Sequence, residues 1–183
     1  IDIINLFRKN IFLESSILNI KNKLKSNSYQ RVHEAIKELE EKDILNSKQI
    51  GNSSLISLNL SNLSIIELSY IDEKESFLKK IPNMEKIMDF EEFFDDIILV
   101  AGSYASGKQT PKSDIDLVII TKDEIIKKQK LIENLTSLFI PKIHPIVISY
   151  KDFTDMLLNN KENYGKEIFR NKLLFRNSRG YYQ

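Results

Sequence analysis

A buried strand that runs directly into a glycine, followed by a second strand bearing paired carboxylates, is the feature that most constrains this chain. The apolar run Ile97–Gly102 ends at that glycine, and a short polar loop then leads to the sequence SDIDL over residues 113–117. Asp114 and Asp116 are two residues apart, so on a strand their side chains point to the same face, and the alternating Ile115 and Leu117 point into a core. The sequence therefore predicts two strands with a polar site at one end.

Each part of this segment suits the chemistry of phosphates. Gly102 allows the backbone to bend, so that the amide and hydroxyl of Ser103 can approach an anion closely. A helix that started at Ser103 would also direct its N-terminal amides and dipole toward that anion. Two neighbouring carboxylates suit Mg²⁺, or Mn²⁺, bound to nucleotide phosphates. Lys108 and Lys112 flank the loop, and their side chains could either contact a phosphate or simply be solvated.

The two motifs, G-S-x-A-x-G over residues 102–107 and S-D-I-D-L over residues 113–117, resemble the DNA polymerase β-like nucleotidyltransferase superfamily, particularly its minimal members. The resemblance covers about residues 84–180. It implies transfer of a nucleoside monophosphate from a nucleoside triphosphate to an acceptor hydroxyl, with release of pyrophosphate. It assigns metal binding and catalysis to Asp114 and Asp116, and triphosphate binding to Gly102 and Ser103. We also expect Lys108 and Ser113 to contact the nucleotide.

One departure from the family pattern concerns a third carboxylate, which active members usually carry on the next strand. The corresponding segment 142–149 has none; His144 takes the expected position, and Asp152 follows shortly after. Histidine can act as a base or a ligand, although Mg²⁺ prefers oxygen. His144 is therefore the third expected catalytic residue. Two hypotheses stay open: an enzyme, or a nucleotide-sensing DNA-binding regulator without turnover. Minimal nucleotidyltransferases often work beside a helical partner protein, which is a third possibility.

Residues 11–60 resemble a winged helix-turn-helix domain. Apolar residues at helical spacing over 27–45 predict a helix, with an N-cap within residues 26–28 and Gln30 in capping-box register with Asn27. The segment 47–60 alternates polar and apolar residues and bends at residues 51–53, which predicts a β-hairpin. Six basic residues and one acidic residue between positions 8 and 31 give a local excess of +5, which could meet DNA phosphates. The expected DNA-contacting residues are Ser28, Tyr29, Gln30 and Arg31, with His33 as a possible addition. The second half of that helix is acidic, so a protein-contact or dimerisation role stays open.

Helix and strand patterns alternate after residue 84, which predicts an α/β (α+β) nucleotidyltransferase fold with a mixed sheet, preceded by a small winged-helix α+β domain. The expected strands are 97–101, 115–121 and 143–149, and the expected helices are 84–94, 123–139, 151–160 and 163–171. The proposed domains are 1–62 and 84–183, joined by a helical linker over 63–83. The stretch 161–183 mixes basic and aromatic residues; we favour an amphipathic closing helix there over a nucleic-acid contact.

The composition is typical of a globular protein and excludes several kinds of site. Hydrophobic residues make up 42% of the chain and charged residues 29%, values typical of a globular protein with a core. The absence of cysteine excludes disulfides, thiolate zinc sites and cysteine nucleophiles. The net charge of +1 means that nucleic acid could be attracted only by local patches. No apolar run approaches the roughly 20 residues of a membrane span, and no secretory signal is evident, so we expect a cytoplasmic protein without a membrane partner.

Overall fold

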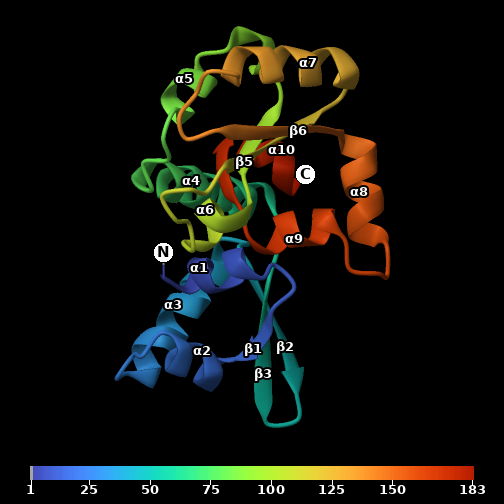
Figure 1. Ribbon diagram of the computed structural model, residues 1–183. Coiled ribbons are helices and arrows are strands. Elements are labelled where there is room, and N and C mark those ends of the chain that lie inside the picture. The colour runs from blue at the N-terminus through green and yellow to red at the C-terminus, as the bar shows by residue number, and fades with distance from the viewer. Residues whose placement is uncertain (1) are drawn as a thin grey trace. The chain divides into compact units, whose positions relative to one another are not determined.

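The computed structural model describes residues 2–183 (Figure 1). The chain divides into two compact units, with the boundary between Ile71 and Asp72. This boundary lies inside the 17-residue helix α4 (Asn62–Leu78). The sequence predicted a helical linker over residues 63–83, and α4 covers residues 62–78 of the chain. The division into domains at residues 62 and 83 remains a prediction.

The first unit combines three helices with a small antiparallel sheet. Its elements before α4 are α1 (Asp2–Lys9), β1 (Glu14–Ser16), α2 (Ile17–Lys23), α3 (Tyr29–Glu41), β2 (Leu45–Ile50) and β3 (Ser53–Leu58). The strand order is β1-β3-β2. Apolar residues of the helices and strands, among them Ile20, Ile36 and Ile56, are almost completely buried. This helix–strand–helix–helix–hairpin order is compatible with a winged helix, but assignment to that family remains a prediction.

Both ends of α3 differ in detail from the expectation. The N-cap is Ser28, whose hydroxyl accepts from the Arg31 amide at 3.3 Å, and Gln30 donates to Glu34 at 2.9 Å instead of completing a capping box with Asn27. The helix ends at Glu41 rather than near residue 45, because Asp43 adopts a left-handed backbone (φ +58°) and the chain then enters β2. The predicted hairpin is present.

The second unit is built on a four-stranded sheet. Its strands are β4 (Ile97–Val100), β5 (Ile115–Thr121), β6 (Ile143–Ser149) and β7 (Leu173–Arg176). Its helices after α4 are α5 (Met84–Met88), η1 (Glu91–Phe93), α6 (Gly102–Ser106), α7 (Ile125–Thr136), α8 (Tyr150–Leu158), α9 (Tyr164–Arg170) and α10 (Ser178–Tyr182). The sheet order is β6-β5-β4-β7, with β5 and β6 parallel and the other pairs antiparallel. The predicted mixed sheet is confirmed.

Two expected helices in this unit are wrong. The helix expected over residues 84–94 is broken into α5 and η1, because Phe90 between them has an extended backbone and packs against the hydrophobic core. Residues 173–176 form β7 rather than part of a closing amphipathic helix. This short apolar segment pairs with the free edge of β4 and buries Leu173–Phe175; periodicity alone cannot distinguish such a strand from a buried helical turn.

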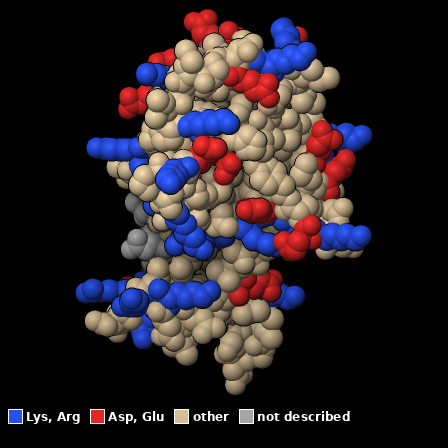
Figure 2. All heavy atoms as spheres, in the orientation of Figure 1, with Lys and Arg blue, Asp and Glu red and all other residues tan. Residues whose placement is uncertain are grey.

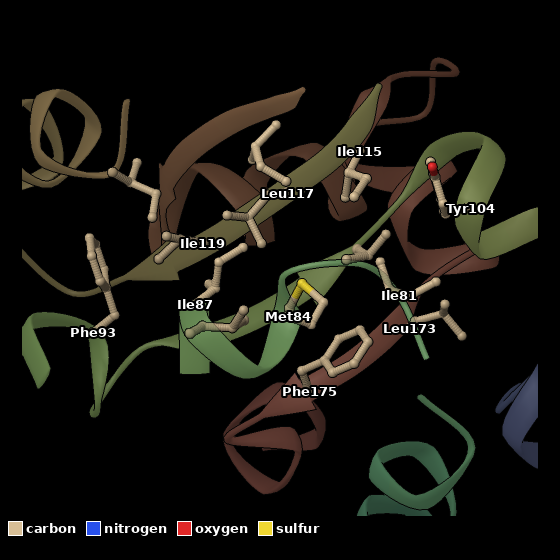
Figure 3. Close-up of a cluster of buried hydrophobic side chains, with 14 of the residues drawn as sticks. Ile81, Met84, Ile87, Phe93, Tyr104, Ile115, Leu117, Ile119, Leu173 and Phe175 are labelled. Atoms are coloured by element: carbon tan, nitrogen blue, oxygen red, sulfur yellow. The ribbon is translucent and has the colours of Figure 1, made fainter. Parts of the chain in front are cut away.

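Apolar side chains on one face of the sheet form the core shown in Figure 3. Ile115, Leu117 and Ile119 of β5 point into it, where they meet Met84 and Ile87 of α5. Side chains alternate along a strand, so Asp116 belongs to the opposite face. Helix α8 contacts β5 and β6 and also contacts α9 (Figure 1). The candidate site therefore lies on the face of the sheet opposite to the α5 core.

Candidate functional site

The loop after β4 is shaped by two glycines with left-handed backbones. The Ala101 amide donates to the Asp116 carbonyl at 2.9 Å, which ties the end of β4 to β5. Gly102 (φ +63°) then begins α6, one residue earlier than expected. Gly107 (φ +70°) ends it, where the Lys108 amide donates to the Ser103 carbonyl at 2.9 Å. The loop is thus one tight helical turn between two glycines.

The carboxylate of Asp116 lies directly against the backbone of this loop. A Cβ atom added to Gly102 would lie 2.0 Å from Oδ2 of Asp116, far inside van der Waals contact. Only glycine leaves room for the carboxylate. The structure therefore brings together the glycine loop and one of the two predicted carboxylates.

His144 lies on the other side of Asp116. The two residues are register partners on the parallel strands β5 and β6, and Nδ1 of His144 is 3.5 Å from Oδ1 of Asp116. The His144 side chain is 63% exposed and that of Asp116 is 35% exposed, so both can reach a ligand from solvent. Asp114 is exposed and lies in the loop just before β5 rather than on the strand, because the strand begins at Ile115.

Ser113 is engaged in the structure of the loop. Its hydroxyl accepts from the Thr110 amide at 2.9 Å, and its amide donates to the Thr110 carbonyl at 3.0 Å. These bonds close the turn that leads to Asp114. Lys108 and Lys112 have exposed side chains beside the loop. A nucleotide contact by Ser113 or Lys108 remains a prediction.

Asp152 does not supply the missing third carboxylate. Its Oδ2 accepts from the Ser149 hydroxyl at 2.6 Å, and its amide donates to the same hydroxyl, so Asp152 is bound to Ser149, the N-cap of α8. His144 and Ser149 stand near opposite ends of β6, about 16 Å apart at the usual rise of a strand. Within residues 2–183, no group of three or more Asp, Glu or His side chains is arranged to hold a metal ion.

Tyr164 is a residue whose ionisation is influenced by the charge of Asp116, which sequence reasoning did not anticipate. It is the first residue of α9 and its side chain is half-buried. Burial, followed by the negative charges of Asp116 and Glu167, raises the pKa of Tyr164 to about 12. The phenol is therefore neutral at physiological pH. Its position depends on how α9 folds back on α8, which no local pattern in the sequence reveals.

The predicted DNA-contacting residues lie at the first turn of α3. Tyr29, Gln30 and Arg31 are exposed, and the Tyr29 ring stacks on His33 at a centroid distance of 6.2 Å. Ser28 is occupied as the helix cap. Figure 2 shows several Lys and Arg side chains over the helices of the first unit, whereas both signs of charge are mixed over the second unit. A role in DNA binding remains a prediction.

Comparison with protein families gives a match to part of the second unit. The family model described as a nucleotidyltransferase domain matches residues 81–168. This segment includes both sequence motifs together with Gly102, Asp116, His144 and Tyr164, so the match supports a nucleotidyltransferase domain here. Comparisons with curated proteins and with solved structures gave no match. No helix within residues 2–183 has both the length and the apolar character needed to cross a membrane.

Proposed function

We propose that the second unit transfers a nucleoside monophosphate from a Mg²⁺-bound nucleoside triphosphate to an acceptor hydroxyl. The observation that carries this proposal is the carboxylate of Asp116 packed against the backbone of Gly102, inside a segment that matches the nucleotidyltransferase family model. A phosphate loop and a carboxylate in contact with each other are what an enzyme needs to bind a metal–triphosphate complex.

The residues around Asp116 fit a hard cation that arrives on the nucleotide. Asp114 and Asp116 would hold Mg²⁺ or Mn²⁺, and the amides of Gly102 and Ser103 would bind phosphate oxygens. Mg²⁺ is commonly held by one or two carboxylates plus substrate phosphates and water, so two carboxylates are sufficient for binding. When bound, the ion would supply neutralisation of the charge on the phosphates.

His144 is the residue that we propose as the base. The acceptor oxygen attacks the α-phosphorus, the bond from that phosphorus to the bridging oxygen breaks, and pyrophosphate leaves with the electron pair. The proton of the acceptor hydroxyl passes to the Nε2 atom of His144, while Nδ1 faces Asp116 at 3.5 Å. An imidazole can accept a proton near neutral pH, and a neighbouring carboxylate stabilises the cation that forms.

A transfer assay tests the proposal. The protein is incubated with Mg²⁺, each of the four ribonucleoside triphosphates labelled at the α-phosphate, and RNA, protein or small hydroxyl acceptors. Both labelled product and released pyrophosphate are measured. The double variant Asp114→Asn, Asp116→Asn should abolish both. Asp95→Asn, an exposed carboxylate before β4 at the opposite end of the sheet, is the matched control. Undiminished transfer by the double variant would show that the site is assigned wrongly.

A second candidate is a nucleotide-sensing DNA-binding regulator with little or no turnover. It is favoured by His144 in place of the third carboxylate and by the absence of a three-residue metal group among residues 2–183. This candidate predicts binding of Mg²⁺–ATP without pyrophosphate release. The same assay therefore separates the two candidates. A helical partner protein, as the resemblance implies, is compatible with either.

In both candidates we propose that the first unit binds DNA through the start of α3. Arg31→Ala should weaken binding to duplex DNA and reduce the slope of log affinity against log salt by about one, because one phosphate contact is lost. Fluorescence anisotropy over a salt series measures both quantities. Lys130→Ala, an exposed lysine of α7, removes the same charge from the other unit and should have no effect. No binding to DNA even at low salt would exclude this role.

A further inference from the structure

Strand β6, which carries His144, is an edge strand of the four-stranded sheet. The sheet order is β6-β5-β4-β7, so β6 has a neighbouring strand on one side only, the parallel strand β5. In a parallel ladder, one residue bonds to two residues of the neighbouring strand, donating its amide to the first and accepting from the amide of the second. A further parallel strand beside β6 would therefore use one carbonyl and one amide, two residues apart, on the outer edge of β6.

The side chain of Gln129, on α7, takes both of these outer groups. Its Nε2 donates to the Pro145 carbonyl at 2.9 Å, and its Oε1 accepts from the Val147 amide at 2.7 Å. Only one orientation of the carboxamide satisfies both bonds, because its nitrogen only donates and its oxygen only accepts. Helix α7 packs along β6 (Figure 1), and Gln129 thereby replaces one residue of a missing fifth strand.

The position of the His144 ring depends on the backbone of β6. His144 directly precedes Pro145 and is the register partner of Asp116 across β5 and β6. Its side chain is 63% exposed, so little packing holds the ring. Within the part of the chain that the structure describes, its one polar contact is that of Nδ1 with Oδ1 of Asp116 at 3.5 Å. The strand that bears the ring therefore sets its distance from Asp116.

We propose that Gln129 is a positioning residue, which holds β6 by its outer edge and so keeps His144 against Asp116. This inference rests on the proposed function, in which His144 is the base. A base must lie within hydrogen-bond reach of the proton that it accepts, and a displacement of about 1 Å can lower a rate by roughly a hundredfold. The ladder with β5 fixes β6 from the inside, and the Gln129 carboxamide fixes it from the outside.

Turnover of Gln129→Leu tests this role. The variant keeps the apolar stem of the side chain and removes both bonds to β6. We expect kcat to fall by about tenfold or more, because the base is displaced. The Kd of Mg²⁺–ATP should stay unchanged, because the glycine loop and the two carboxylates belong to other elements. Expressing kcat per ATP-binding site, counted by isothermal titration, removes the contribution of unfolded protein.

Two controls on the same helix separate positioning from stability. Glu133→Ala removes only the exposed bond that Gln129 makes within α7, at 2.7 Å. Thr136→Val removes a buried bond from the Thr136 hydroxyl to the Ile132 carbonyl, also at 2.7 Å, and so weakens α7 without removing a bond to β6. Both variants should keep the kcat of the wild type per ATP-binding site.

Proton NMR measures the position of the histidine without turnover. The chain has two histidines, His33 in the first unit and His144, so their ring signals are readily distinguished. At a fixed pH, Gln129→Leu should shift or broaden the His144 signals and leave those of His33 unchanged. The Val147 amide should also exchange with deuterium about tenfold faster or more, because it loses its acceptor.

The outcomes for Gln129→Leu decide the inference. Wild-type exchange of the Val147 amide together with unchanged His144 signals overturns the hold on β6. An unchanged kcat per ATP-binding site, or an equal loss in Thr136→Val, overturns the positioning role.

Failure of the proposed function is recognised separately. Undiminished turnover by the variant Asp114→Asn, Asp116→Asn, or a wild type that releases no pyrophosphate, overturns the proposed function itself. In either case the NMR signals of His144 still decide whether Gln129 fixes the position of that ring.

Discussion

Gly102 is restricted to glycine by two separate requirements. Its φ of +63° lies in the left-handed region that L side chains rarely adopt, and Oδ2 of Asp116 occupies the space of a Cβ. Gly107 has a similar φ of +70° but nothing within 4 Å of an added Cβ. Comparing substitutions at Gly102 and Gly107 therefore separates the effect of backbone strain from the effect of steric contact with the Asp116 carboxylate.

Gly102→Ala should lower both stability and Mg²⁺–ATP affinity, whereas Gly107→Ala should lower only stability. Backbone strain costs about 1–2 kcal/mol at either position, but only the methyl group at position 102 displaces Asp116. Chemical denaturation measures the first quantity and isothermal titration the second. Equal effects of the two variants on nucleotide affinity would contradict the role of the Gly102–Asp116 contact.

At the scale of elements, α7 is anchored to the sheet by a buried ion pair. Nζ of Lys128 lies 2.9 and 2.7 Å from the two carboxylate oxygens of Asp96 and 2.9 Å from the Thr121 hydroxyl. The side chains of Lys128 and Asp96 are only 13% and 4% exposed. The pair connects a helix with the segments that flank β4 and β5, so it fixes the end of the sheet opposite to the candidate site.

Lys128→Met should reduce the free energy of unfolding by about 3–5 kcal/mol, because it leaves the Asp96 carboxylate buried without its cation. Adding Asp96→Asn to the same protein should recover much of this loss. Lys127→Met, which removes the neighbouring exposed pair with Glu124, is the control and should change little. Urea denaturation compares the three variants. A small loss for Lys128→Met alone would mean that water enters this end of the sheet.

For the whole molecule, alkaline pH should reduce stability through its buried tyrosines. Burial, with a smaller effect of the Asp72 charge, raises the pKa of Tyr181 well above its ordinary value, and its hydroxyl has no hydrogen-bond partner among residues 2–183. A folded pKa above the unfolded one means that the stabilisation is fully present below about pH 10 and is lost as the pH rises through the folded value. Tyr164 acts in the same direction, with its pKa near 12.

Tyr181→Phe should therefore flatten the decline of stability above pH 10. At neutral pH the variant should be as stable as the wild type or more stable, because it removes a buried hydroxyl without a partner. Denaturant midpoints between pH 8 and pH 11.5 test both expectations, and the comparison cancels the titration of lysines. An unchanged slope would show that Tyr181 ionises freely in the folded protein.

The sequence by itself determined the strands whose patterns are local. Three short segments rich in isoleucine, leucine and valine predicted β4, β5 and β6, and the glycine loop followed by S-D-I-D-L predicted a polar site at one end of the sheet. These features depend on neighbours along the chain, where the period of two and the backbone freedom of glycine act directly. The resemblance to nucleotidyltransferases was carried by the same residues, and the family match covers them.

Only the tertiary structure decided which residues meet at that site. Asp116 contacts Gly102 and faces His144 because β5 lies between β4 and β6 in the sheet, and residues 173–176 became a strand because β4 had an unpaired edge. Asp152, near His144 in sequence, instead bonds to Ser149, the N-cap of α8, at the far end of β6. Each of these outcomes depends on contacts between residues far apart in the chain, so the packing of whole elements, rather than any local pattern, placed a glycine and a histidine against Asp116.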